Sequence, residues 1–112
     1  MSNTATVERT NTSRDELAEH ICKICDDIKK LLSTKNISYG NPDDGFYNFR
    51  EASRRIENRT DVEGMMKMLM VYVDKHWVAL TQNNIRTPEL KERFMDIVLY
   101  SLIAITMIDK EL

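Results

Sequence analysis

One stretch of the chain, residues 36–50, limits the folds open to the rest. It is where Gly, Pro, Asn and Asp cluster, so we expect a structured turn there rather than a helix. Within it, Gly40 is expected to adopt a left-handed conformation. Helical patterns flank this stretch on both sides. The sequence therefore predicts an all-α protein organised around one long turn.

The first helix is expected over residues 13–33. Ser13 and Glu16 have the spacing of a capping box at its start. Apolar side chains then recur every three or four residues, which predicts a core-facing stripe: Leu17, Ile21, Ile24, Ile28 and Leu31. A second, shorter helix is expected from about residue 44 or 45 to residue 58.

The third helix is expected to begin with a capping box of Thr60 and Glu63 and to end near residue 82. Its predicted core stripe is Val62, Met65, Met66, Leu69, Val73, Trp77 and Leu80. Thr87 followed by Pro88 gives an N-cap with Pro at the first helical position, so a fourth helix begins there.

The fourth helix is apolar on two sides. One side carries Leu90, Phe94, Ile97, Val98, Ser101, Leu102, Ile105 and Ile108. The opposite side carries Leu99, Ile103 and Met107. Because a helix that is apolar on two faces needs two partners, we expect a homodimer formed through this last helix.

Length and connections complete the predicted architecture. A chain of 112 residues suggests one domain. Short connections favour antiparallel neighbours, so we expect a compact, mostly antiparallel bundle of three long helices and one short helix. This single helical domain would span residues 13–112. Residues 1–12 are polar and poor in apolar side chains, which predicts a disordered N-terminal tail.

Charge and hydropathy exclude some partners. The net charge is −2, so there is no basic excess to neutralise phosphates, and direct nucleic-acid binding is not expected. The longest apolar stretch, residues 97–108, is about half of the ~20 residues that a membrane span needs. A secretory signal pattern is also missing. We therefore expect a cytoplasmic protein without membrane association and with reduced cysteines.

The two cysteines and His76 could have either a chemical or a structural role. Cys22 and Cys25 form a lone CxxC in the middle of a helix, where two small side chains filling a helix flank are favoured over a zinc or redox site. His76 falls within the core stripe of the third helix. A histidine there is usually a satisfied core or boundary residue.

Carboxylates offer the best candidates for a metal site. Glu92 and Asp96 are one helical turn apart on the second apolar face of the last helix. Glu16 and Asp27 share an edge of the first helix with His20. Carboxylates on two facing helices are typical of bundle metal sites, and Mg²⁺ prefers such oxygens. The alternative is that these are solvated charges. Lys75 alone would be a surface lysine, and Arg50 beside the turn could reach a phosphate.

Several short motifs resemble a known family. They are Tyr39-Gly40-Asn41-Pro42, Gly45-Phe46-Tyr47-Asn48-Phe49-Arg50, Gly64-Met65-Met66, Asp74-Lys75, and Glu92-xxx-Asp96-xxx-Tyr100. Over roughly residues 35–108 the chain resembles small proteins common in bacteriophage genomes. These look like compact relatives of the all-α nucleotide pyrophosphohydrolases, the MazG and dUTPase-like group.

The resemblance implies a dimeric or larger helical protein in which carboxylates hold Mg²⁺. The substrate would be a nucleoside triphosphate, cleaved by water between its α and β phosphates. By position, Glu92 and Asp96 match the carboxylates of the last motif, and Lys75 matches a lysine that meets phosphate. The residues implied to line the base or sugar side of the pocket are Tyr39, Asn41 and Asn48.

The chain also departs from the catalytic pattern of that family. The hydrolases carry ExxE and ExxD pairs, whereas here the later pair is spaced E-xxx-D and the early one is at best Glu16 with Glu19. His20 or Asp27 could substitute. With fewer acids, metal-assisted attack by water loses support, so the chain could bind nucleotides without turnover.

A second hypothesis belongs to another class of protein. The chain would be a phage-encoded, non-enzymatic protein that inhibits or redirects a host protein, such as a defence nuclease or polymerase. Small size, a two-faced last helix and the methionines at positions 68, 70 and 95 favour it. A purely structural oligomer is a third possibility.

Overall fold

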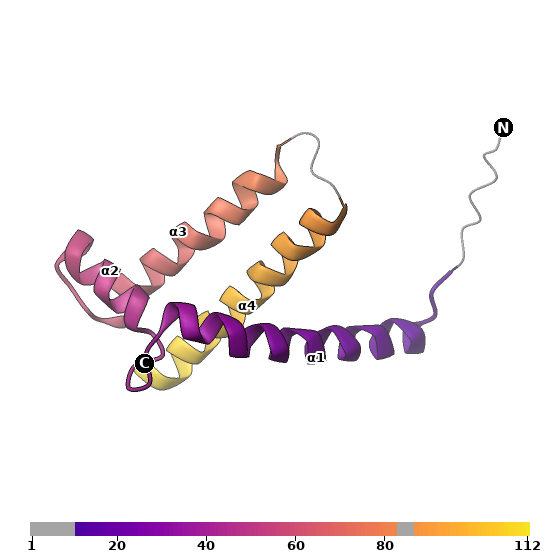
Figure 1. Ribbon diagram of the computed structural model, residues 1–112, viewed down its shortest axis with the longest axis horizontal. Coiled ribbons are helices and arrows are strands. Elements are labelled where there is room, and N and C mark those ends of the chain that lie inside the picture. The colour runs from indigo at the N-terminus through magenta and orange to yellow at the C-terminus, as the bar shows by residue number, and fades with distance from the viewer. Residues whose placement is uncertain (1–10, 83–86) are drawn as a thin grey trace.

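The computed structural model of the protein describes residues 11–82 and 87–112, and within these ranges it contains four α-helices and no strand. The helices are α1 (Arg14–Tyr39), α2 (Tyr47–Glu57), α3 (Val62–Leu80) and α4 (Thr87–Glu111) (Figure 1). The predicted all-α bundle of three long helices and one short helix is therefore confirmed. The predicted disordered tail lies almost entirely outside the described residues.

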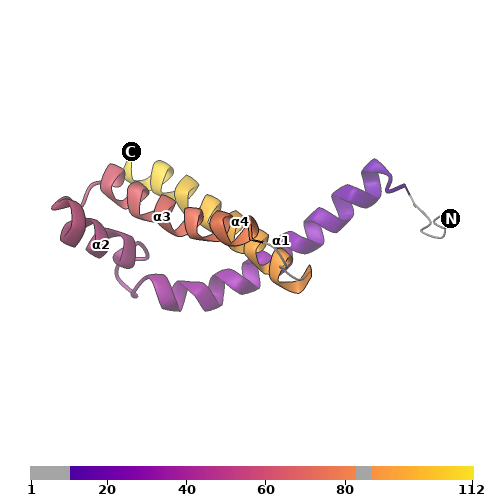
Figure 2. The same ribbon diagram turned by 90° about the horizontal axis from the view of Figure 1, so that it is seen from above.

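The packed part of the molecule is built around α3. Helices α3 and α4 lie side by side and antiparallel, and α2 covers the N-terminal part of α3 (Figures 1 and 2). Their contact contains the core: Phe49, Ala52, Met65, Met68, Leu69, Tyr100 and Met107. Phe49 meets the ring edges of Tyr72 and Tyr100 at centroid distances of 5.7 and 6.5 Å, while Tyr72 stacks on Tyr100 at 6.0 Å. Such aromatic pairs add stability beyond the area they bury.

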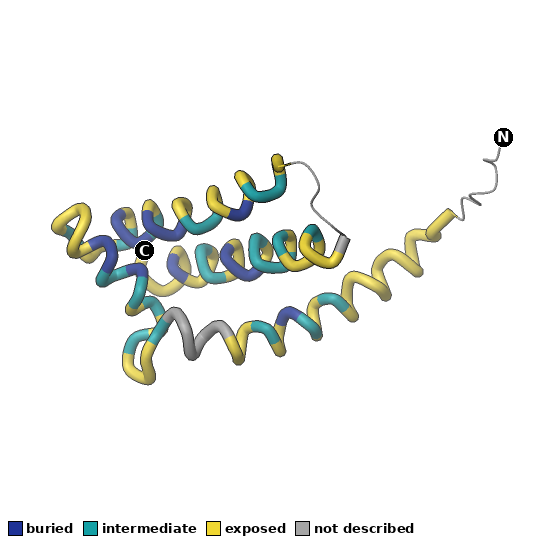
Figure 3. Tube along the Cα trace, turned by 45° about the horizontal axis from the view of Figure 1, so that its top comes forward, coloured by how far each residue is buried: buried dark blue, intermediate teal, exposed yellow. Residues whose placement is uncertain are grey.

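Helix α1 joins the bundle with only its C-terminal half. Ile28 is buried at 5% exposure, but Leu17 and Ile21 are 52% and 48% exposed. The N-terminal half projects beyond the ends of α3 and α4, and Figure 3 shows it exposed almost throughout. The prediction that the whole α1 stripe faces the core is therefore wrong for this half, because the other helices end before they can cover it. Cys22 and Cys25, expected to fill a helix flank, are exposed free thiols.

Helix α4 buries the face that carries fewer apolar residues, and the more apolar face stays half exposed. Leu99, Tyr100 and Met107 are buried, whereas Phe94, Val98, Leu102, Ile105 and Ile108 remain 46–53% exposed. Both faces are apolar, so hydropathy alone could not decide between them. The aromatic pairs of Tyr100 with α2 and α3 show which face docks.

The turn is shorter than predicted. Helix α1 continues to Tyr39, since no Gly or Pro precedes Gly40 to stop it. Gly40 does not have a positive φ; it is needed because a Cβ there would lie 2.6 Å from the carbonyl oxygen of Gly45. Asn41 closes the turn, because its Oδ1 accepts hydrogen bonds from the backbone N–H groups of Asp43 and Asp44 at 2.9 and 2.7 Å.

The start of α3 is also displaced from the prediction. Asp61, not Thr60, is the N-cap residue, and its carboxylate accepts from the backbone N–H of Gly64 at 3.1 Å. Gly64 lets α3 approach Ser53 of α2 closely. Met68 is buried in the core rather than lying on the surface. Trp77, placed in the core stripe by its spacing, is 47% exposed.

Among the described residues, no helix combines the length and apolar character required to cross a membrane.

Candidate functional site

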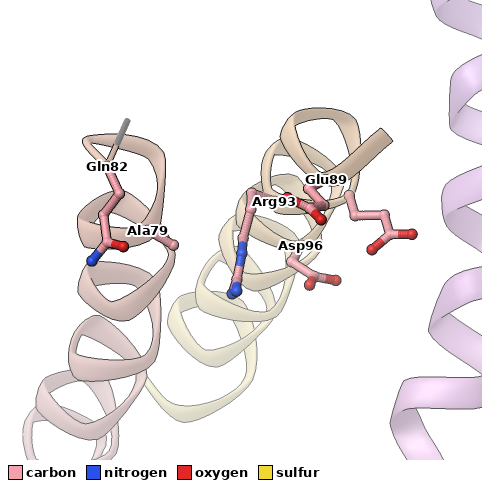
Figure 4. Close-up of a pocket in the computed structure, with 6 residues that line it drawn as sticks. Ala79, Gln82, Glu89, Arg93 and Asp96 are labelled. Atoms are coloured by element: carbon pink, nitrogen blue, oxygen red, sulfur yellow. The ribbon is translucent and has the colours of Figure 1, made fainter. Parts of the chain in front are cut away.

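A cavity of about 430 Å³ lies between the C-terminal end of α3 and the N-terminal half of α4 (Figure 4). Its lining residues are Ala79 of α3, Gln82 just after the end of α3, and Glu89, Glu92, Arg93 and Asp96 of α4. The α4 residues recur at intervals of three, one and three, so they share one edge of the helix. Three carboxylates and one guanidinium, all from α4, line this space, which makes the cavity acidic.

Asp96 sits where α4 meets α3. Its Oδ2 lies 3.8 Å from Nε2 of His76, and Nη1 of Arg93 lies 3.0 Å from Nδ1 of the same ring. A guanidinium can only donate hydrogen bonds, so Nδ1 must accept and the ring proton belongs on Nε2, facing Asp96. His76 is 9% exposed and its ring packs 5.5 Å from that of Tyr100. The predicted role of His76 as a satisfied core residue is confirmed, and the ring also fixes the side chains at the cavity edge.

A second hollow of about 310 Å³ opens on the other side of the same carboxylates. Leu31 of α1, Glu92, Met95 and Asp96 line it. Glu92 and Asp96 therefore border two spaces, one towards α3 and one towards α1. Asp27 is half-buried one helical turn before Leu31. Helices α1 and α4 run in the same general direction (Figures 1 and 2). The residues that line the two spaces do not include Asp27.

Glu16, by contrast, is not brought to this cavity. It lies at the projecting end of α1, in a separate hollow with Glu19, His20 and Lys23. The predicted capping box is confirmed: the N–H of Ser13 donates to Glu16, and the N–H of Glu16 donates to the Ser13 hydroxyl, both at 3.1 Å. The bond from the Ser13 N–H lowers the pKa of Glu16. Within the described ranges, no group of three or more His, Cys, Asp or Glu side chains is placed to hold a metal ion.

The candidate residues of the turn lie at the other end of α4. Arg50 donates to Asp44 at 2.8 Å, to the carbonyl oxygen of Thr60 at 3.1 Å and to Glu111 at 3.1 Å. The Arg50 hydrogen bond holds the pKa of Asp44 below its usual value, and Asp44 raises that of Arg50. Glu111 follows Asp96 by 15 residues, or about 22 Å of helix. Arg50 therefore ties the turn to the end of α4, far from Glu92.

The resemblance also implied that Tyr39, Asn41 and Asn48 contact the base or sugar, and none of them is among the described residues that line the cavity beside Asp96. Asn41 is engaged within the turn through its Oδ1. Asn48 is half-buried in the first turn of α2. The side chain of Tyr39 lies outside the described residues. Their part in ligand binding remains a prediction, and the cavity beside Asp96 is assembled without them.

Lys75 is exposed on α3, one helical turn before Ala79, and so shares the edge of α3 that lines the cavity. The sequence did not single out Glu89, Arg93 and Gln82 as site residues. The helical spacing from Glu89 to Arg93 and Asp96 could have indicated the first two. Gln82 could not be found in this way, because its position depends on how α3 and α4 pack.

A search of protein-family models, of curated proteins and of solved structures found no match to this chain.

Proposed function

We propose that the chain binds a nucleoside triphosphate together with Mg²⁺ at the cavity between α3 and α4, as the resemblance to MazG-like proteins implies. One observation supports this most directly. Glu92 and Asp96, one helical turn apart, both open into a space of about 430 Å³. That volume falls within the roughly 300–1,000 Å³ of typical small-molecule sites.

The negative charge of the cavity means that a triphosphate would bind only together with a cation. Three carboxylates and one guanidinium leave it negative, so a bare triphosphate would be repelled. A divalent cation held by Glu92 and Asp96 would cancel this net charge of about −2. Mg²⁺ is commonly bound by one or two carboxylates and completed by substrate phosphates and water. Lys75 and Arg93 would then neutralise the outer phosphates. Asp27 of α1 stays a sequence prediction as a ligand, because the described residues hold no group of three carboxylates placed for one ion.

Hydrolysis belongs to the same proposal as its second step. Water would add to a phosphorus atom of the α–β bridge, the bridging P–O bond would break, and pyrophosphate would leave with the nucleoside monophosphate as the other product. Glu92 and Asp96 would hold the Mg²⁺ ion, which would supply stabilisation of the developing charge. His76 holds Arg93 and faces Asp96 from the buried side, which limits the rotation of both side chains.

Calorimetric titration with each dNTP and NTP, with Mg²⁺ and then with EDTA, tests the proposal. We expect binding only with Mg²⁺, and at least a tenfold loss of affinity in Glu92→Gln and in Asp96→Asn. Glu19→Gln is the matched control, since Glu19 is exposed on the projecting part of α1. Release of pyrophosphate is measured on the same samples. No binding of any nucleotide, or equal binding by the Glu92→Gln and control variants, would refute the proposal.

A non-enzymatic role in binding a host protein is the second candidate. The outward face of α3 favours it, because Met70, Val71 and Val78 are 62%, 64% and 49% exposed there. Of the other two methionines that the sequence hypothesis named, Met68 is buried and Met95 is half-buried. A protein captured from host lysate by the wild type and by Glu92→Gln, but not by Val71→Asp/Val78→Asp, would support this role. Capture that is unaffected by the α3 substitutions would exclude this surface.

A further inference from the structure

The projecting part of α1, residues 14–24, is here called the arm. It exposes two large aliphatic side chains, Leu17 and Ile21, at 52% and 48%. Leu17, Ile21, Ile24, Ile28 and Leu31 alternate in steps of four and three residues. This is the spacing at which one helix packs its side chains into another. Ile28, further along this row, is buried by the chain's own bundle, whereas Leu17 and Ile21 are not covered by any other helix that the structure describes.

Helix α4 carries a second unpartnered row, here called the outer stripe. Phe94, Val98, Ser101, Ile105 and Ile108 follow the same steps of four and three. Its apolar members are 46–53% exposed, as is the adjacent Leu102. Trp77 of α3 extends this surface, because its ring meets that of Phe94 edge to face at 6.1 Å. The arm projects past the end of α4 (Figures 1 and 3), so within one chain it does not cover the outer stripe.

We propose that a second copy of the chain covers both rows: the arm of each copy packs on the outer stripe of α4 in the other. The matching four-and-three spacing lets their side chains interdigitate. The 11 residues of the arm measure about 16 Å, and the outer stripe from Phe94 to Ile108 about 21 Å. One arm therefore covers most of one stripe. A two-fold axis makes the exchange reciprocal, so both rows of each copy are buried at once.

The area is sufficient for a stable dimer. Leu17, Ile21 and the five exposed aliphatic and aromatic side chains of α4 are each about half exposed. At on the order of 80 Å² each, they offer about 550 Å² of apolar surface per copy. Apolar atoms make up about 65% of homodimer interfaces, so the full contact would be about 850 Å² per copy, near the ~800 Å² of standard interfaces. An arm left in water would gain little, because short isolated helices are marginal.

Sedimentation velocity of the full chain at micromolar concentration is the first test. We expect a dimer for the wild type and a monomer for the arm variant Leu17→Glu/Ile21→Glu. The stripe variant Val98→Glu/Ile105→Glu is also expected to be a monomer. Val71→Glu/Val78→Glu on the outer face of α3 is the matched control and should stay dimeric. All these positions are exposed, so circular dichroism should show unchanged helix content in each variant.

Mixing the two monomeric variants identifies the contact. The arm variant retains an intact outer stripe and the stripe variant an intact arm, so together they can form one of the two contacts. We expect a heterodimer that neither variant forms alone. Trp77 is the single tryptophan and borders the outer stripe. Its emission should therefore shift to longer wavelength when the wild type is diluted, and should already be shifted in both monomeric variants.

Three results would overturn the proposal. One is a wild type that stays monomeric. The arm and the outer stripe would then be covered by the chain's own N-terminal residues or by a different protein. Another is an arm variant that dimerises as well as the wild type, which would show α4 pairing with α4. The third is the absence of any heterodimer on mixing. None of these depends on nucleotide binding, so the dimer and the proposed function can fail separately.

Discussion

Replacing Gly64 with Ala tests how closely α2 and α3 approach each other. A Cβ on Gly64 would lie 2.1 Å from Oγ of Ser53 and 2.8 Å from Cγ of Arg59. Ser53 is fully buried, and its hydroxyl donates to the carbonyl oxygen of Arg59 at 2.6 Å. The new methyl group therefore has to displace a side chain that has no room to move and that holds the α2–α3 connection.

Opposing effects determine the size of the change. Overpacking of a core costs about 1–3 kcal/mol, and losing the Ser53 hydrogen bond costs about 1 kcal/mol. Ala gains about 1 kcal/mol over Gly within a helix. We therefore expect Gly64→Ala to lower the free energy of unfolding by about 1–3 kcal/mol. For a chain of this length that corresponds to a fall in Tm of about 4–12 °C.

Urea denaturation followed by circular dichroism measures the difference. Gly45→Ala is the matched control: Gly45 is exposed in the turn and a Cβ there meets nothing within 4 Å. Its effect should stay within about 0.5 kcal/mol. Gly64→Ala should cost less in a Ser53→Ala background, since Oγ is then absent. A coupling of at least about 1 kcal/mol is expected between these neighbours.

Two outcomes contradict the close-approach explanation for Gly64. If Gly64→Ala stabilises the protein, as replacement of an exposed helical glycine would, the two helices are not in tight contact there. If the effects of Gly64→Ala and Ser53→Ala are additive, the two positions do not touch.

Three further changes test local features of the fold. Asn58 ends α2 with φ 55°, so Asn58→Gly should raise the free energy of unfolding by about 0.5–1 kcal/mol in urea titrations. Because Arg50 holds the pKa of Asp44 below its usual value, ionised Asp44 stabilises the fold above about pH 4, and this contribution is lost as pH falls through the lowered pKa. Asp44→Asn should therefore lower the urea midpoint at pH 7, and its difference from wild type should shrink towards pH 2. Asp61→Ala should lower the Tm, whereas Asp61→Asn, which retains an accepting oxygen, should recover most of the loss.

Much of the local structure was available from the sequence. The three/four spacing of apolar residues predicted four helices, and the Ser13 and Glu16 capping box marks the start of α1. Helix ends were less accurate. Thr60 and Asp61 both have the chemistry of an N-cap, and only the backbone geometry selects Asp61. The pair Glu92 and Asp96 could be placed on one edge of a helix, because i, i+4 spacing alone decides that.

Periodicity determined which residues share a face of a helix, and this is a property of neighbours along the chain. Which face becomes buried depends on residues far apart in sequence. The choice of the Leu99, Tyr100 and Met107 side of α4 follows from the aromatic contacts with α2 and α3. Only the tertiary structure placed His76 between Arg93 and Asp96 and left the arm without cover. The physical reason is that two apolar faces are equivalent in water until one of them meets a partner of matching shape.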